Sequence, residues 1–339
     1  MFPLARIILL VFLGLTTGSQ AQSRFYLPTP NQAIFESGKE AVFFARTTPT
    51  KEWSSGAFGC VRNSGWRFHE GIDILYTQTD SRGEPTDPIF ATTEGVVAYI
   101  NTRTSTSNYG KYVVLEHRVD GFRLYSLYAH LSAVESNLSP GTAVRGGQRI
   151  ATMGRTAPIS PPIAKYRAHL HFEIGLILSD HYAEFLEEHS PKATNHHGNW
   201  NGLNLAGLDP RAFFRERRRL GAGFDLKRFI RDQETMFQVV APTTDFSFAR
   251  RYPQLIVPNP AVRSSDVVAM EIAFNYHGLP FQMIPRSFEE VGHLTEPRLV
   301  GFDQRVAADQ KCCRLAQTSR PELRSGAWTR IKQLIYNPE

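Results

Sequence analysis

Three short histidine motifs stand out in this chain of 339 residues. They read HEGID at 69–73, YAHL at 128–131 and HLHF at 169–172. Imidazole and carboxylate groups are zinc ligands, and catalytic zinc sites use three protein ligands and keep a fourth position for water. The motifs supply enough such groups for three ligands, with two histidines left for proton transfer. These residue types therefore point to zinc-dependent hydrolysis.

The last motif predicts a β-strand. The polar residues His169, His171 and Glu173 alternate with apolar residues at 170, 172 and 174, so the polar set shares one face. Two residues along a strand span roughly 6.5 Å, which suits one metal ligand beside one catalytic group. Glu173 either orients a ligand imidazole from behind or lies at the surface. His117 follows another strand-like run, at 112–116, and is expected at the surface.

The first motif is not the helical zinc motif HExxH. Asp73 stands where that motif needs its second histidine, and the Gly71-Ile72 pair weakens a helix. We therefore expect residues 69–73 to form a loop that enters a strand.

The three motifs, in this order, resemble those of the LytM/lysostaphin-type zinc endopeptidases, the M23 peptidases. The glycine-rich segments between the motifs, at 89–97, 109–117 and 141–154, also resemble that family's framework. The resemblance covers roughly residues 60–175, about a third of the chain. It implies a mainly β fold, with an antiparallel, duplicated hybrid motif-like catalytic domain and zinc in a groove.

The resemblance also implies a role for each motif residue. His69, Asp73 and His171 would bind one Zn²⁺ per chain, and His130 and His169 would form the catalytic pair. The implied activity is that of an endopeptidase acting on cross-links or stem peptides of bacterial peptidoglycan. One departure from the family pattern is a Pro-rich insert at 158–167, just before the last histidines, which bears on substrate preference.

Other functions stay open beside this one. Some relatives have lost their ligands and regulate cell-wall amidases without catalysis, although this chain keeps the whole ligand set. A secreted protease acting on glycine-rich proteins is a further alternative. Residues 22–58 could also cover the groove and keep the enzyme latent, with Asn63 as a candidate occluding ligand.

The N-terminus predicts export. Arg6 precedes an apolar run at 7–15, and the small residues Ser19 and Ala21 fit a signal peptide cleaved after residue 21. We therefore expect a periplasmic or extracellular protein without a transmembrane anchor. An oxidising compartment permits disulfides. Three arrangements remain open for the cysteines: a bond from Cys60 to Cys312 or Cys313, a vicinal bond, or three free thiols.

Composition suggests three parts after the signal peptide. We expect an N-terminal segment at 22–58 that packs on the catalytic domain through strands at 25–28 and 41–44, an M23-type peptidase domain at 59–212, and a β-rich domain of unrecognised family at 224–339. Strands are expected at 236–240, 267–274 and 298–302, with a final helix after Pro321. A β-sandwich with a wall-binding role would fit this last part.

The net charge and the histidines outside the three motifs are less informative about function. The formal net charge is +6, which suits an anionic wall polymer or a membrane surface. No nucleic-acid recognition motif accompanies the basic cluster at 215–219, which is expected on a solvated helix face. The histidines at 181, 189, 196 and 197 indicate either a second metal site or a solvated loop.

Overall fold

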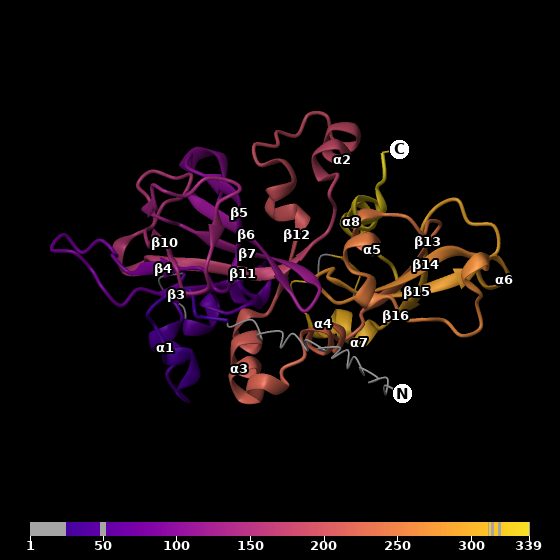
Figure 1. The fold of residues 1–339 in the computed structure, drawn as a ribbon, viewed down its shortest axis with the longest axis horizontal. Helices are drawn as coiled ribbons and strands as arrows, with labels where there is room; N and C mark the ends of the chain where they lie inside the picture. Colours follow the sequence, from indigo (N-terminus) through magenta and orange to yellow (C-terminus); the bar gives the residue numbers. More distant parts are fainter. Residues whose placement is uncertain (1–24, 48–51, 311, 313–314, 318–319, 339) are drawn as a thin grey trace, which may run out of the picture.

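The computed structural model describes residues 25–47, 52–310, 312, 315–317 and 320–338. The predicted signal peptide at 1–21 lies outside these residues. No helix in the described part has the length and apolar character needed to cross a bilayer. The larger β-structure and the C-terminal sheet lie side by side along the long axis of the molecule (Figure 1).

A seven-stranded antiparallel sheet forms the centre of the N-terminal half. Its longest strand, β11, is buried along its whole length and pairs on one edge with β7. On the other edge, β3 pairs with residues 169–172 of β11 and β12 pairs with residues 174–177. The members are β12 (Leu205–Leu208), β11 (His169–Ile177), β7 (Phe122–Ala129), β6 (Tyr112–Val119), β5 (Gly95–Asn101), β9 (Ala143–Val144) and β3 (Ile72–Leu75).

Two smaller antiparallel sheets flank this one. They consist of β4 (Pro88–Phe90), β10 (Arg149–Thr152) and β8 (Ala133–Val134), and of the hairpin β1 (Gly59–Arg62) and β2 (Arg67–His69). The mainly antiparallel β fold is therefore confirmed. The first histidine motif differs in detail from its prediction: His69 ends one strand and Asp73 lies in the next, so the motif is a tight connection between β2 and β3.

The N-terminal segment contains a short helix where a strand was expected. Residues 41–43 lie in α1 (Glu40–Phe43), and the Phe44 backbone N–H donates to the Glu40 carbonyl at 2.8 Å. The prediction of a strand at 41–44 is therefore wrong, and an isolated bridge from Phe44 to Ile74 is the pairing made there. Residues 25–28 form no strand either, although Tyr26 donates a backbone hydrogen bond to Thr92.

The basic cluster lies on α3 (Pro210–Leu220), whose N-terminus is capped by Asp209. Arg211 and Arg215 reach the Glu40 carboxylate at 2.7 and 3.1 Å. The Arg218 guanidinium lies over the Phe35 ring at 4.3 Å from its centroid. The helix is confirmed, but several of its arginines hold the N-terminal segment instead of forming a purely solvated face.

The C-terminal part contains one four-stranded antiparallel sheet in its described residues, in the order β15-β14-β13-β16, rather than a two-sheet sandwich. Its strands are β13 (Phe237–Ala241), β14 (Val267–Phe274), β15 (Pro280–Ser287) and β16 (Arg298–Phe302). The helices outside α1 and α3 are α2 (Tyr182–His189), α4 (Leu226–Arg231), α5 (Ser247–Arg251), α6 (Phe288–Val291), α7 (Gln304–Asp309) and α8 (Ser325–Ile335).

The three predicted strands and the final helix of this part are confirmed, whereas β15 was missed. Its two prolines, Pro280 and Pro285, argue against a strand in sequence. The end position of β15 in the sheet order tolerates them, because proline lacks the N–H that a central strand would need.

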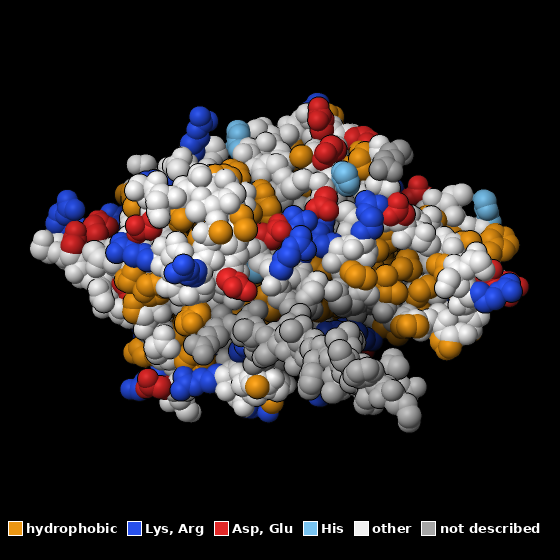
Figure 2. Space-filling view, viewed as in Figure 1, with side chains coloured by type: hydrophobic (Ala, Val, Ile, Leu, Met, Phe, Trp, Pro, Cys, Tyr) orange, Lys and Arg blue, Asp and Glu red, His pale blue; other side chains and the backbone are white. Residues whose placement is uncertain are grey.

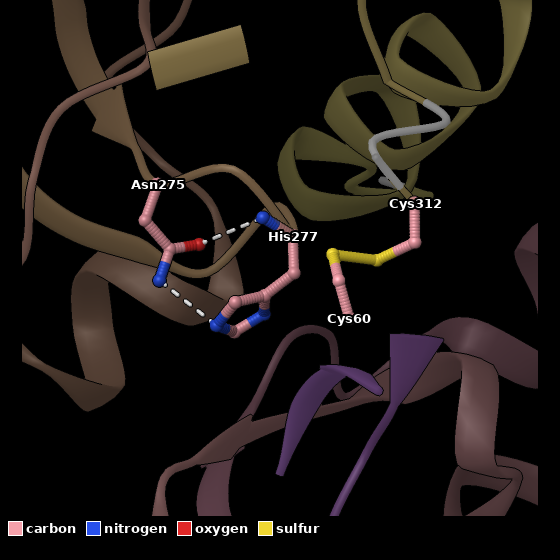
Figure 3. The surroundings of a disulfide bond; sticks show 4 residues. All are labelled: Cys60, Asn275, His277 and Cys312. Carbon is pink, nitrogen blue, oxygen red and sulfur yellow. Dashed lines mark hydrogen bonds between the residues drawn. A yellow bond between two sulfur atoms is a disulfide. The ribbon is translucent and has the colours of Figure 1, made fainter. Parts of the chain in front are cut away.

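The two halves are joined covalently and by packing. Cys60 in β1 forms a disulfide with Cys312, 252 residues later, so the described residues favour that pairing; Cys313 lies outside them. Beside the bond, His277 is held by Asn275 (Figure 3), and its ring stacks on Phe68 at a centroid distance of 4.8 Å. One hydrophobic core runs from Leu27 to Leu334, and α3 crosses the domain end expected at 212.

His117 is buried and not at the surface, which corrects its prediction. It lies within β6 and is fully inaccessible to solvent. Its Nδ1 is 2.7 Å from the Glu94 carbonyl and its Nε2 is 2.7 Å from the Ser126 hydroxyl. Burial lowers the pKa of His117 to about 4, because the uncharged ring fits this site better than the imidazolium.

We predict that the disulfide stabilises the fold. Cys60→Ser should lower the free energy of unfolding by about 2–4 kcal/mol, because the bond restricts a very long loop in the unfolded chain. Urea titration of both proteins measures the difference. Cys313→Ser is the matched control and should keep the disulfide, as seen by mass spectrometry without reduction. A Cys60 bond that survives in Cys312→Ser but not in Cys313→Ser would contradict the pairing.

We also predict a pH-dependent contribution from His117. Its folded pKa lies below the unfolded value, so the unfolded state binds more protons between about pH 6.5 and 4, and stability falls as the pH falls through this window. The loss should approach about 3 kcal/mol. Urea titrations with chelator, for the wild type and His117→Gln, measure it. Equal losses in both proteins would show that His117 does not cause the effect.

Candidate metal centre and catalytic histidines

The pairing of β3 with β11 places the candidate site. Asp73 lies directly opposite His171 in the antiparallel register, where side chains on one face are about 5 Å apart. The chain reaches this position through Gly71. A Cβ atom on Gly71 would lie 2.2 Å from the Phe172 carbonyl oxygen, so the absence of a side chain there permits the close approach of the two segments.

Three of the predicted site residues converge on one point. His69 Nε2 is 3.0 Å from His171 Nδ1, and each of these nitrogens is 3.1 Å from Asp73 Oδ1. All three side chains are buried. His69, Asp73 and His171 have the geometry of a metal site, and in the described part of the chain no other group of histidine, cysteine or acidic residues has it. The histidines at 181, 189, 196 and 197 form no such group there.

In both His69 and His171, the ring nitrogen that points away from the group is hydrogen-bonded to an acceptor outside it. His69 Nδ1 lies 2.7 Å from the Ala57 carbonyl, and His171 Nε2 lies 2.8 Å from a Glu173 carboxylate oxygen. A hydrogen bond on one ring nitrogen fixes the tautomer and leaves the other as a lone-pair donor. His69 Nε2 and His171 Nδ1 are therefore the nitrogens available to a metal.

Glu173 is buried, so of its two predicted placements the structure favours the orienting one over the surface one. Its carboxylate accepts hydrogen bonds from the Tyr109 hydroxyl at 2.6 Å and from the Tyr125 hydroxyl at 2.8 Å, besides the contact with His171. Sequence reasoning missed both tyrosines. Tyr109 lies in a loop and Tyr125 in another strand, and no spacing rule connects them to Glu173.

The two histidines predicted as the catalytic pair lie beside the group. Their rings are 4.8 Å apart, centroid to centroid. His130 Nδ1 is 2.7 Å from the Thr156 carbonyl, and His169 Nδ1 is 2.6 Å from the Arg167 carbonyl. Each ring thus donates its Nδ1–H to the backbone and keeps Nε2 as the basic nitrogen. His169 Nε2 lies 3.4 Å from Asp73 Oδ2.

The backbone at His130 is strained. Its φ of 60° lies in the left-handed region, directly after β7 ends at Ala129. For a residue other than glycine this conformation costs of the order of 1–3 kcal/mol, and such strain is concentrated at functional sites. The turn directs the imidazole across the end of the strand toward His169.

The electrostatics keep most of these imidazoles neutral. Burial lowers the pKa of His69 to about 4 and that of His130 to about 3, and it also lowers the pKa of His169. His171 differs: burial opposes its charge, but hydrogen bonds to Asp73 and Glu173 raise its pKa to about 9. Burial would likewise raise the pKa of Asp73, yet Arg62 and the neighbouring histidines hold it well below its usual range.

Arg62 is a site residue that sequence reasoning missed. Its Nη2 lies 2.5 Å from Asp73 Oδ2 and 2.9 Å from His69 Nε2. Asn63, the candidate occluding ligand, lines the same cleft of about 300 Å³, but the neighbouring Arg62 is the side chain that reaches the donor group. The hairpin turn after β1 separates Arg62 from the motifs, so no motif pattern includes it.

The region that contains the site resembles a known protein family. Residues 67–181 match the model of Peptidase family M23. This part of the chain, about a third of its length, is therefore similar to the M23 peptidases. The match agrees with the resemblance seen in the sequence at roughly 60–175. No protein of curated function matches the chain at a significant level.

Solved structures are similar to parts of the chain. A zinc-containing peptidase from Vibrio cholerae is 27% identical over 32% of this chain and 26% of its own, with a TM-score of 0.24. Csd3 from Helicobacter pylori is 18% identical over 60% and 42%, with a TM-score of 0.29. The lysostaphin catalytic domain from Staphylococcus simulans is 20% identical over 47% and 86%, with a TM-score of 0.28. The matched part of this chain thus covers about a quarter of the Vibrio cholerae peptidase and less than half of Csd3.

The donor set formed by His69, Asp73 and His171 fits zinc. Two imidazole nitrogens and one carboxylate oxygen are ligand types of catalytic zinc, and three protein ligands leave a position for water. The buried oxygen and nitrogens face one another, and the remaining ring nitrogens are already hydrogen-bonded. His69, Asp73 and His171 would hold the ion.

We predict that Glu173 tunes metal affinity through His171. Glu173→Gln should weaken Zn²⁺ binding about 10–100-fold, because an amide holds the His171 N–H less strongly than a carboxylate does. Competition with a chromophoric chelator measures the affinity. Glu116→Gln, which changes a carboxylate on β6 that pairs with Arg123, is the matched control and should bind as the wild type does. Equal affinities for all three proteins would contradict the role of Glu173.

Proposed function

We propose that this chain is a zinc-dependent endopeptidase that hydrolyses stem peptides or peptide cross-links of bacterial peptidoglycan. The observation that carries the proposal is the orientation of four imidazoles in one cluster, three of which line the same cleft. Two of them, His69 and His171, face Asp73 with a ring nitrogen, and the other two keep Nε2 as the basic nitrogen close by. In each ring the opposite nitrogen is held by a backbone carbonyl or by Glu173.

The proposed mechanism follows from these orientations. Zn²⁺ held by His69, Asp73 and His171 would supply a Lewis acid that activates water and polarises the scissile carbonyl. His130 and His169 are neutral at pH 7, so either Nε2 can accept a proton from the attacking water and return it to the leaving amine. The backbone carbonyls of Thr156 and Arg167 fix both rings for this transfer.

We further propose that the mature chain acts outside the cytoplasm, in the periplasm or beyond the cell. A disulfide between residues so distant in sequence is compatible with an oxidising compartment. The C-terminal part has two proposed roles, wall binding and support of the site. The second is favoured by the contact of His277 with Phe68, the residue next to His69.

The alternatives are less well supported. A non-catalytic regulator of amidases has no need of a complete donor set with oriented rings. A protease of glycine-rich proteins would use the same metal chemistry, so it differs from the main proposal only in substrate.

We predict that zinc-loaded protein releases soluble muropeptides from purified peptidoglycan and that a chelator abolishes the release. His171→Ala should lose both zinc and release. His130→Ala should keep its zinc while losing about 10²–10⁴-fold in rate, because it removes only a proton-transfer group. Mass analysis of the fragments identifies the bond, and elemental analysis measures the zinc.

Wild-type protein that binds one zinc but releases nothing would direct attention to a glycine-rich protein substrate, which is assayed in parallel. Failure to bind zinc at all would overturn the metalloenzyme proposal.

A further inference from the structure

The cleft beside the donor group is lined by three arginines from separate places in the sequence. Arg62 ends β1, Arg67 begins β2, and Arg167 lies at the end of the Pro-rich insert. Arg62 and Arg67 are cross-strand partners in the hairpin. Like charges directly opposite each other destabilise a strand pair, and the ion pair of Arg62 with Asp73 offsets part of that cost, while Arg67 has no such partner in the described chain.

These arginines are incompletely paired within the described chain. No carboxylate lies within ion-pair distance of Arg67 or Arg167 there, and Arg167 Nη2 donates to the Thr47 backbone carbonyl. The Nε atoms of both Arg62 and Arg167 are buried and lack a hydrogen-bond partner. A buried N–H without an acceptor is costly and uncommon, and an acceptor supplied by a ligand would satisfy it.

The charge of the cleft favours an anionic ligand that can accept these hydrogen bonds. Three guanidinium groups and one carboxylate, Glu70, line the cleft, and Arg62 also pairs with the buried Asp73. A divalent metal ion at the donor group would add further positive charge. A guanidinium fork matches the planar geometry of a carboxylate with two parallel hydrogen bonds. An uncharged glycine bridge would offer these groups peptide carbonyl oxygens but no opposite charge.

Arg167 also lies close to the proposed chemistry. Its backbone carbonyl holds His169, while its side chain lines the cleft. The insert that ends at Arg167 is tied down by Lys165, which lies 3.3 Å from Glu84, the carboxylate that Arg155 also binds at 2.6 Å. The insert therefore presents a fixed cation at the edge of the site, next to one of the two histidines proposed for proton transfer.

We infer that Arg67 and Arg167 form a subsite for a carboxylate of the substrate, close to the scissile bond, with Arg62 completing the positive wall. The inference rests on the proposed endopeptidase function and narrows its substrate. The preferred substrates would be stem peptides or D-alanyl cross-links that carry free carboxylates, rather than glycine bridges. These arginines are specificity residues and take no part in proton transfer.

The test uses three synthetic probes: a stem-peptide dimer joined through a D-alanyl bond with free carboxylates, the same dimer with its carboxylates amidated, and pentaglycine amide. Binding by calorimetry and steady-state hydrolysis are measured for the zinc-loaded mature chain. Wild-type protein should bind the free-carboxylate dimer roughly tenfold or more tightly than the amidated one, because a hydrogen bond to a charged group is lost.

Variants separate the subsite from a general loss of structure. Arg167→Gln and Arg67→Gln should raise the KM and Kd of the free-carboxylate dimer roughly tenfold, with kcat and zinc content nearly unchanged and little effect on the amidated dimer. Arg118→Gln, an exposed arginine of β6 outside the cleft, is the matched control and should behave as the wild type.

The outcomes distinguish this inference from the function on which it rests. Hydrolysis without preference for carboxylates, or faster hydrolysis of pentaglycine amide, would overturn the subsite and leave the peptidase proposal intact. Carboxylate-dependent binding that Arg167→Gln weakens, without hydrolysis of any probe, would support the subsite and contradict the peptidase. Equal binding of both dimers by the wild type, left unchanged in Arg67→Gln and Arg167→Gln, would overturn the subsite whatever the hydrolysis.

Discussion

The buried carboxylate of Asp73 is the interaction on which the site depends. It is fully inaccessible to solvent and lies within 3.4 Å of three imidazoles, with the Arg62 guanidinium on its other oxygen. A buried carboxylate without partners would be strongly unfavourable. Here the partners come from β1, β2 and β11, so the charge of Asp73 draws three separate strands to one point. The register of β3 against β11 then fixes where that point lies.

The histidines can serve different chemistry because their second nitrogens have different partners. Backbone carbonyls hold His69, His130 and His169, whereas the buried Glu173 carboxylate holds His171. Burial lowers the pKa of the first three rings and leaves them uncharged at neutral pH, whereas the carboxylates of Asp73 and Glu173 raise the pKa of His171. The hydroxyl groups of Tyr109 and Tyr125 donate further hydrogen bonds to the Glu173 carboxylate. The site is thus supported by hydrogen bonds that reach well beyond the residues facing the cleft.

The parts outside the family match at 67–181 support the walls of the cleft. The hairpin of β1 and β2 carries Arg62, Arg67 and His69, and it is a two-stranded sheet, which is marginally stable by itself. The Cys60 disulfide and the stacking of His277 on Phe68 fasten it to the C-terminal half (Figure 3). On the face drawn in Figure 2, acidic and basic side chains are intermixed.

The sequence by itself determined the local features of this protein: the strand at 169–174, the shared face of His169, His171 and Glu173, and the resemblance of roughly residues 60–175 to the M23 peptidases. These follow from period-two alternation and from motifs a few residues long. Only the tertiary structure decided the partners of Glu173, the burial of His117, the approach of Arg62 to Asp73 and the choice of Cys312. Each depends on contacts between distant segments, and hydrophobic pattern and spacing carry no information about which segments meet. The same limit explains why α1 replaced an expected strand, since a short apolar run fits either conformation until its neighbours are known.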